Sequence, residues 1–273
     1  MKRYPTVLTI AGSDSGGGAG IQADLKTFAA LGAYGTAAIT ALTAQNTQGV
    51  RAIHAVPAAF LREQLEAVFE DITIDAVKIG MINTVDVVEV IAGVLDRFQP
   101  PFVVFDPVMV ATSGAKLILD ETVGVLKTQL FPRATLITPN LDEARMLLKK
   151  PIESVDQMRE AAEELIAQGC RAVLLKGGHL VAARLYDVLA VRGEATQVFE
   201  SEYIASKNVH GTGCTLSSAI ATYLALGHAL TEAVSLAKAY VSGAIQAGKD
   251  ITTGQGSGPL NHSYAPKPMQ IRS

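Results

Sequence analysis

One segment in the last third of the chain combines glycines, hydroxyl groups and a thiol. It reads His-Gly-Thr-Gly-Cys-Thr over residues 210–215 and runs directly into apolar residues at helical spacing. Glycines leave the backbone free to turn successive N–H groups toward one point, and a helix N-terminus adds its positive dipole end. We therefore expect Gly211, Thr212 and Gly213 to form an anion-binding turn, suited to the charge on a transferring phosphoryl group.

Cys214 stands at the start of the helix that follows this turn. A helix N-terminus lowers the pKa of a thiol, and a thiolate beside a substrate hydroxyl can accept its proton. The alternative is that Cys214 is a small buried apolar residue, which is a common fate of free cysteine. We prefer that alternative only for Cys170, which lies between Gly169 and an apolar run.

Polar residues that suit a nucleotide and a metal follow three other apolar runs. Asn140 and Glu143 are three residues apart at an expected helix start, so they share one face. Asp106 and Glu143 together can hold Mg²⁺ through water, because this ion keeps much of its hydration. Lys176, followed by two glycines, can reach nucleotide phosphates. The plainer interpretations are that Glu143 is an ordinary first-turn acid and that Lys176 is solvated.

The glycine-rich loop over residues 12–20 matches neither of two familiar phosphate-binding motifs. A dinucleotide-binding fingerprint requires a glycine where Ile21 stands, and a Walker A loop requires a glycine before Lys26, where the chain has Leu25. An NAD-linked oxidoreductase is therefore disfavoured. The loop is either a plain strand-to-helix turn or a site where the backbone approaches a ligand.

The elements that position these residues alternate between strands and helices. Fully apolar runs of strand length predict strands that are covered on both faces. These runs are residues 6–10, 76–79, 102–105, 135–137 and 172–175, and residues 185–191 and 197–203 are expected to form an antiparallel hairpin at an edge. Repeated strand–helix units predict an α/β protein with a mostly parallel sheet, in which ligands bind beyond the carboxyl ends of the strands.

Composition excludes several classes of protein. The chain has 273 residues, 49% of them hydrophobic, and a net charge of −3. This charge disfavours nucleic acid or an anionic membrane as the main partner. The N-terminus has no secretory pattern, and two cysteines exclude a disulfide framework, so we expect a cytoplasmic protein. No linker interrupts the chain, which predicts a single domain over 1–273, with an ordered core of about 5–262 and a short C-terminal tail.

Seven segments together resemble the hydroxymethylpyrimidine/phosphomethylpyrimidine kinases of thiamine biosynthesis, in the ribokinase-like superfamily. The match runs in order from about residue 6 to 262, and the combination is highly specific. The segments are Thr9-Ile-Ala-Gly-Ser-Asp-Ser-Gly-Gly-Gly-Ala-Gly-Ile-Gln-Ala-Asp-Leu-Lys-Thr27, Ala41-Leu-Thr-Ala-Gln-Asn-Thr47, Lys78-Ile-Gly-Met81, Asp106-Pro-Val-Met109, Ile137-Thr-Pro-Asn140, Lys176-Gly-Gly-His179 and His210-Gly-Thr-Gly-Cys214.

The resemblance implies a three-layer α/β/α fold and a kinase that uses ATP and Mg²⁺. Its substrate would be 4-amino-5-hydroxymethyl-2-methylpyrimidine, phosphorylated first to the monophosphate and then to the diphosphate. The family's pyrimidine pocket corresponds to Gly12, Asp24, Thr43, Gln45, Met81 and Val108, with Cys214 close to the reacting oxygen. Residues 109–116 correspond to a mobile loop over the site, and family members are typically homodimers. The Gln45 amide suits an aminopyrimidine because it can both donate and accept hydrogen bonds.

The main alternative is a pyridoxal kinase, because a branch of that activity shares the scaffold, the anion hole and the cysteine. Gln45 favours the aminopyrimidine, since the pyridoxal branch tends to carry an apolar residue there. A nucleotide-binding protein without turnover is disfavoured while Asp106, Lys176 and the whole 211–214 turn are present.

Overall fold

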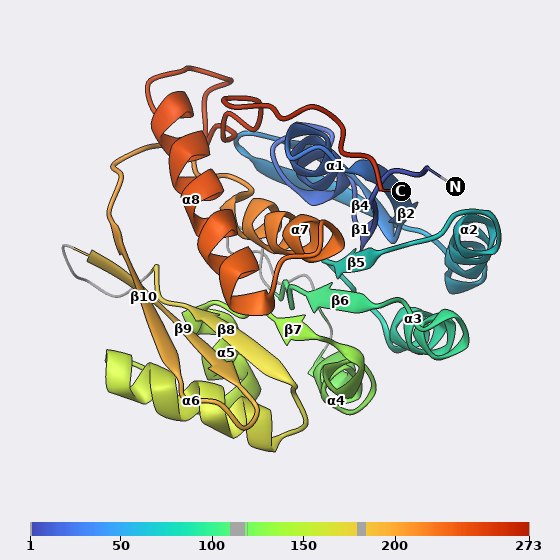
Figure 1. Cartoon of the computed structure of the whole chain (residues 1–273), viewed down its shortest axis with the longest axis horizontal. Coiled ribbons are helices and arrows are strands. Elements are labelled where there is room, and N and C mark those ends of the chain that lie inside the picture. Colours follow the sequence, from blue (N-terminus) through green and yellow to red (C-terminus); the bar gives the residue numbers. More distant parts are fainter. Residues whose placement is uncertain (1, 110–117, 119, 179–183, 273) are drawn as a thin grey trace.

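A computed structural model describes residues 2–109, 118, 120–178 and 184–272 of the chain. Within these residues one eight-stranded sheet runs through the molecule in the order β10-β9-β8-β7-β6-β5-β1-β2 (Figure 1). Its strands are β1 (Thr6–Ala11), β2 (Tyr34–Ile39), β5 (Ala76–Ile79), β6 (Phe102–Phe105), β7 (Leu136–Ile137), β8 (Ala172–Lys176), β9 (Arg184–Val191) and β10 (Gln197–Glu202).

The strands from β2 through β8 are parallel, and β9 and β10 are antiparallel at one edge. This arrangement confirms the predicted edge hairpin and the mostly parallel sheet. Alternate residues of each central strand face opposite sides, so the sheet contributes to two separate apolar cores. In β5, for example, Val77 and Ile79 join one core and Ala76 joins the other.

Helices cover both faces of the sheet, which confirms the three-layer α/β/α fold (Figure 1). One core is closed by α1 (Gly20–Ala30), α7 (Thr212–Ala225) and α8 (Leu230–Gly248). The other is closed by α2 (Ala58–Asp71), α3 (Val85–Phe98), α4 (Asp120–Gln129), α5 (Leu141–Leu148) and α6 (Val155–Ala167), with a short 3₁₀ turn at Phe131–Arg133. Every residue of α7 from Thr215 onward is buried, because α1, α8 and the sheet surround this helix.

A separate two-stranded sheet follows β2 almost directly. It consists of β3 (Ala41–Asn46) and β4 (Gly49–Ala55), which pair in antiparallel fashion. The N–H of Ser13 donates to the carbonyl of Ala41 at 2.8 Å, so this small sheet lies beside the loop after β1. Its strands place Thr43 and Gln45 next to that loop.

The C-terminal segment pairs with the body of the protein, whereas the sequence suggested a tail beyond about residue 262. The N–H of Lys267 donates to Ala30 O and that of Gln270 to Gly32 O, both at 2.8 Å. Arg272 and Arg3 form a backbone bridge, and both guanidinium groups bind the carboxylate of Asp75. The two chain ends therefore lie side by side, as Figure 1 shows.

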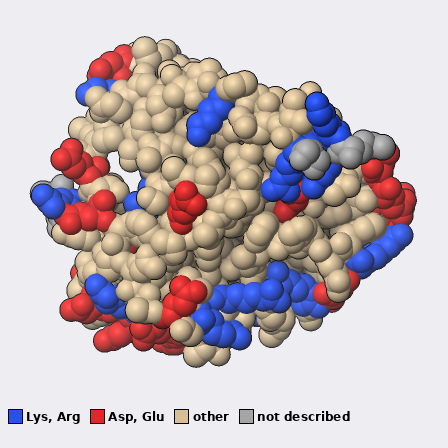
Figure 2. All heavy atoms as spheres, viewed as in Figure 1, with Lys and Arg blue, Asp and Glu red and all other residues tan. Residues whose placement is uncertain are grey.

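The described surface carries charges of both signs. Figure 2 shows acidic and basic side chains around the edge of one face, with mostly uncharged atoms at its centre. No helix in the described part of the chain combines the length and apolar character needed to cross a bilayer.

Candidate active site

A cavity of about 990 Å³ lies where the parallel strands end. Its wall is built from loops that follow β1, β5, β6, β7 and β8, together with β3, the residues after β10, the start of α7 and part of α8. Of the site residues expected from the sequence, those on its wall are Gly12, Thr43, Gln45, Met81, Asp106, Val108, Asn140, Glu143, Lys176, Gly211, Thr212, Gly213 and Cys214. The sheet edge thus gathers residues that are up to 202 positions apart in the chain (12 to 214).

The turn before α7 depends on a glycine at its first position. Gly211 caps the helix with φ of 85°, and a Cβ there would lie 1.9 Å from the carbonyl oxygen of Gly18. Glycine is therefore required both by the left-handed backbone and by close contact with the first loop. Among the described residues the N–H groups of Gly213 and Cys214 make no recorded backbone hydrogen bond, and both residues line the cavity.

Thr212 differs from its expected role. Its N–H donates to Val209 O at 3.2 Å, and its hydroxyl donates to the same oxygen at 2.7 Å. Both donors close the tight turn that Gly211 permits, so neither is free to bind an anion. The amides of Gly213 and Cys214 are therefore the remaining candidate anion donors of this turn.

Cys214 is half-buried on the cavity wall. The pKa of its thiol is raised, whereas the sequence analysis expected it to be lowered. Burial raises the pKa of this thiol above its ordinary value, and the carboxylates of Asp24 and Asp106 act in the same direction. The ammonium of Lys78 and an N–H donated by Gly20 oppose this effect without overcoming it. The predicted lowering was wrong because the helix N-terminus acts here against desolvation and two nearby negative charges.

The side chains of Asp106 and Lys176 lie beside Gly213 in the anion-binding turn. Lys176 Nζ and the hydroxyl of Thr138 donate to Asp106 Oδ1 at 2.8 and 2.9 Å. A Cβ on Gly213 would lie 3.3 Å from Lys176 Nζ and 3.5 Å from Asp106 Oδ2. Burial alone would raise the pKa of Asp106, but Lys176 and Lys78 hold it below its ordinary value, so the carboxylate is ionised.

Asn140 and Glu143 form a capping box at the start of α5. Asn140 Oδ1 accepts the N–H of Glu143 at 2.9 Å, and Glu143 Oε2 accepts the N–H of Asn140 at 2.7 Å. Burial raises the pKa of Glu143 to about 7, and the charge of Asp106 adds to this effect while Lys176 opposes it. Both side chains therefore have a structural role in addition to their place on the cavity wall.

Asp24 is not on the cavity wall, contrary to its expected role in substrate binding. Its carboxylate is completely buried, and it accepts hydrogen bonds from Lys78 and from the hydroxyls of Thr9 and Ser218. Lys78 does line the cavity. Burial would lower the pKa of Lys78, but Asp24, Cys214 and Asp106 raise it above its ordinary value, so Lys78 is charged.

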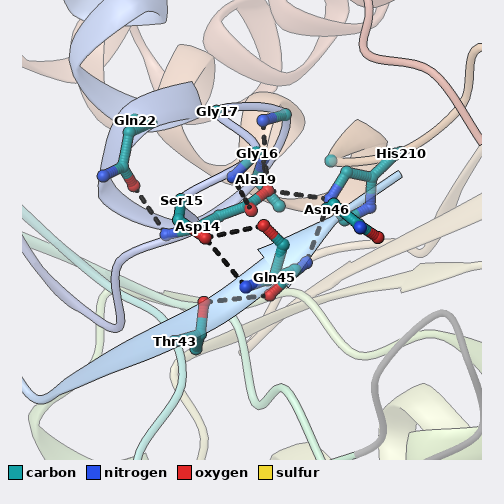
Figure 3. Close-up of polar contacts among 12 residues, drawn as sticks. Asp14, Ser15, Gly16, Gly17, Ala19, Gln22, Thr43, Gln45, Asn46 and His210 are labelled. Atoms are coloured by element: carbon teal, nitrogen blue, oxygen red, sulfur yellow. Dashed lines mark hydrogen bonds and ion pairs between the residues drawn. The ribbon is translucent and has the colours of Figure 1, made fainter. Parts of the chain in front are cut away.

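Residues expected for the pyrimidine pocket form another part of the cavity wall. Gly12 packs so closely on Met81 that a Cβ there would lie 2.6 Å from Met81 Cε. Gln45 lies between Thr43 and His210, with its amide 3.3 Å from Thr43 Oγ1 and 3.2 Å from His210 Nε2 (Figure 3). An amide held at both sides beside a cavity can recognise a ring edge that carries both a donor and an acceptor.

Several residues that line this cavity had no site role predicted from the sequence, among them Asp14, Lys78, Lys238 and Ser206. A signal existed for Lys78, because a lysine in the middle of a buried strand requires a partner charge. Asp14 stood within the segment quoted for the resemblance but was assigned no function. Lys238, on α8, forms an ion pair with Asp187 on β9, and nothing in the sequence links these two residues.

Comparison with known proteins decides the family. The Phosphomethylpyrimidine kinase family model matches residues 14–261. The chain belongs to this family. The family assignment confirms the kinase identified from the seven motif segments.

Two relatives and one solved structure illustrate the similarity. The thiamine biosynthesis bifunctional protein ThiED of Geobacter sulfurreducens is 53% identical over 267 residues, which are 98% of this chain and 54% of that protein. The hydroxymethylpyrimidine/phosphomethylpyrimidine kinase of Escherichia coli is 47% identical over 97% of this chain and 99% of its own length. The chain thus spans about half the length of the bifunctional relative and nearly all of the second.

A solved ADP complex of Bacillus subtilis pyridoxal kinase has the same fold. Its TM-score is 0.88 at 39% identity, and the match covers 96% of this chain and 98% of that one. The fold therefore serves both kinases, and the pocket residues must decide between their substrates.

The described residues contain no group of three or more His, Cys, Asp or Glu side chains arranged to hold a metal. The expected loop over residues 109–116 lies outside the described residues except for Met109, which is buried.

Proposed function

We propose that the chain transfers the γ-phosphoryl group of ATP to the hydroxymethyl oxygen of 4-amino-5-hydroxymethyl-2-methylpyrimidine, and then adds a second phosphate to the product. One observation carries this proposal: the open amides of Gly213 and Cys214 face the same cavity as Gln45, and Lys176 stands beside them. This arrangement supports an anion-binding turn that serves both a bound aminopyrimidine ring and the phosphates of a nucleotide.

In this mechanism the substrate oxygen forms a bond to the γ-phosphorus while the bond from phosphorus to the ADP oxygen breaks. The amides of Gly213 and Cys214 and the ammonium of Lys176 stabilise the charge on the transferring group. Cys214 takes the proton of the substrate hydroxyl as its thiolate, which Lys78 and the Gly20 N–H favour while burial and the nearby carboxylates keep the pKa of the thiol raised. Thr43, Gln45, Met81, Val108 and Gly12 hold the aminopyrimidine.

Lys176, Asn140 and Glu143 are proposed to bind the nucleotide phosphates, and Asp106 and Glu143 to hold Mg²⁺. Both carboxylates lie on the cavity wall, and carboxylate oxygens with remaining water are the ligands that Mg²⁺ prefers. When bound, Mg²⁺ supplies charge neutralisation at the phosphates. The ADP bound by the pyridoxal kinase of the same fold supports a nucleotide site here.

Pyridoxal is the second candidate substrate, because the B. subtilis pyridoxal kinase shares 39% identity and a TM-score of 0.88 with this chain. The test is product analysis with purified protein, Mg-ATP and hydroxymethylpyrimidine, followed by competition with pyridoxal. We expect both the mono- and the diphosphate, with pyridoxal a weaker competitor. A chain that phosphorylates pyridoxal alone would overturn the pyrimidine assignment.

We also propose that the protein is a cytoplasmic homodimer. Two free cysteines, Cys170 and Cys214, fit a reducing compartment. On the small β3–β4 sheet, Leu42 is 46% exposed and Ile53 is 47% exposed, which suits an interface with a second copy. Light scattering of the wild type and of Leu42→Glu tests this, and a monomeric wild type would contradict it.

A further inference from the structure

The carboxylate of Asp14 joins the two glycine-containing loops of the site. Asp14 is 2% exposed, and its oxygens accept the N–H groups of Gly16 at 2.8 Å, Gly18 at 3.1 Å and Ala19 at 2.9 Å. Oδ2 of the same carboxylate lies 2.9 Å from His210 Nε2 (Figure 3). Because His210 directly precedes the anion-binding turn, this contact ties that turn to the loop after β1.

The contact determines which nitrogen of His210 carries a proton. Burial would raise the pKa of Asp14, but the hydrogen bonds from His210, Ala19 and Gly16 hold it below its ordinary value. The carboxylate is therefore ionised at neutral pH and can only accept hydrogen bonds. His210 Nε2 must donate to it, so Nε2 bears a hydrogen.

On the other side of Gln45, Thr43 presents an acceptor. Its hydroxyl has one proton, and that proton is donated to the carbonyl of Ser13 at 2.8 Å. Thr43 Oγ1 therefore has only lone pairs to offer to the Gln45 amide, which lies 3.3 Å away. The amide of Gln45 thus lies between a donor on His210 and an acceptor on Thr43.

These two neighbours select one orientation of the Gln45 amide. Figure 3 draws Nε2 toward His210 and Oε1 toward Thr43, which sets N–H against N–H and lone pair against lone pair. Oxygen and nitrogen of an amide have nearly the same shape, and turning the group over exchanges them. In the turned orientation the carbonyl oxygen shares the single Nε2–H of His210 with Asp14 as a second acceptor, at 3.2 Å against 2.9 Å, and the amino group donates to Thr43.

We propose that Asp14 and His210 act as a positioning pair that locks the Gln45 amide, with its carbonyl toward His210 and its amino group toward Thr43. The carbonyl oxygen then has one lone pair left for the ligand on the His210 side, and the amino group has one N–H left on the Thr43 side. A ring whose amino group adjoins a ring nitrogen matches this order in one orientation only. This inference deepens the proposed function and rests on it for the identity of the ring.

The protonation state can be measured without any substrate. In the unliganded protein with ¹⁵N-labelled histidine, we expect NMR to show a proton on Nε2 of His210. In Asp14→Asn the carboxylate is gone, and this preference for Nε2 should weaken. A wild-type His210 whose Nε2 lacks a proton would overturn the proposal, whatever the enzyme phosphorylates.

Kinetics test whether His210 acts through Gln45. We expect His210→Leu to raise KM for hydroxymethylpyrimidine about tenfold or more, with KM for ATP changed by less than about twofold. His210→Gln retains an N–H near the position of Nε2 and should restore most of the affinity. In a Gln45→Leu background, His210→Leu should raise the pyrimidine KM no further.

Three kinetic outcomes would overturn the proposal: equal increases in KM for both substrates, a fall in kcat with an unchanged pyrimidine KM, or additive effects with Gln45→Leu. A wild type that does not phosphorylate the pyrimidine would instead refute the proposed function. In that case the NMR measurement still decides the protonation of His210. Amide NMR spectra of each variant verify that it is folded.

Discussion

Lys78 Nζ lies 3.0 and 2.9 Å from the two carboxylate oxygens of Asp24, and both side chains are completely buried. The hydroxyls of Thr9 and Ser218 donate to the same carboxylate at 2.6 and 2.7 Å. Ser218 is one helical turn after Cys214 on α7, so this network lies directly beside the expected base. It joins β1, β5, α1 and α7, and its Lys78 lines the cavity.

Removing only the cation of this pair leaves a buried, uncompensated carboxylate. We expect Lys78→Met to lower the free energy of unfolding by about 3–5 kcal/mol, measured by urea denaturation. The double variant Lys78→Met/Asp24→Asn should lose less than the sum of its two single variants. Arg97→Met is the matched control, because Arg97 is 53% exposed and its ion pairs contribute less than about 1 kcal/mol. Equal losses in Lys78→Met and Arg97→Met would contradict the pairing argument.

The position of Gly213 predicts a defect in catalysis without a defect in folding. A methyl group there enters the space between Lys176 Nζ, 3.3 Å away, and Asp106 Oδ2, 3.5 Å away, where the transferring phosphate is proposed to lie. We expect Gly213→Ala to lower kcat about 10²–10³-fold with an unchanged thermal midpoint. Gly93→Ala on α3, where a Cβ meets nothing within 4 Å, should leave kcat unchanged. If Gly213→Ala kept full activity, the anion-binding turn would have to lie elsewhere.

The raised pKa of Cys214 predicts how activity varies with pH. Because burial raises the pKa of the thiol above its ordinary value, the thiolate fraction is small at neutral pH and grows as pH rises. We expect kcat to increase across the range from about pH 7 to 9, and Cys214→Ser to be slower and to lose this rise. A serine variant with the wild-type pH profile would show that another group takes the proton.

Folding stability should fall in acid because of His262. This side chain is 4% exposed, and burial lowers its pKa from 6.5 to about 4. Between these values the unfolded chain binds the proton and the folded chain does not, so stability is full above about pH 6.5 and falls toward pH 4. The loss from this residue is at most about 3 kcal/mol. Urea denaturation across this range should show a shallower decline for His262→Gln, whereas His54→Gln, at an exposed position, should follow the wild type.

The apolar runs of the sequence were sufficient to locate the central strands and the two-sided sheet. Residues 76–79 and 102–105 coincide with β5 and β6, because only strands covered on both faces are apolar throughout. The strands β2, β3 and β4 were not predicted. β2 contains Tyr-Gly-Thr-Ala-Ala-Ile, which has little apolar pattern, and it forms because it pairs with β1.

The sequence by itself determined the residue types of the site, the motif spacing and hence the family, because these depend only on covalent order. Only the tertiary structure decided that Asp24 faces Lys78 and not the cavity, that the donors of Thr212 turn back to Val209, and that desolvation raises the pKa of Cys214. These outcomes depend on distances between groups far apart in the chain and on the exclusion of water, which residue spacing does not encode.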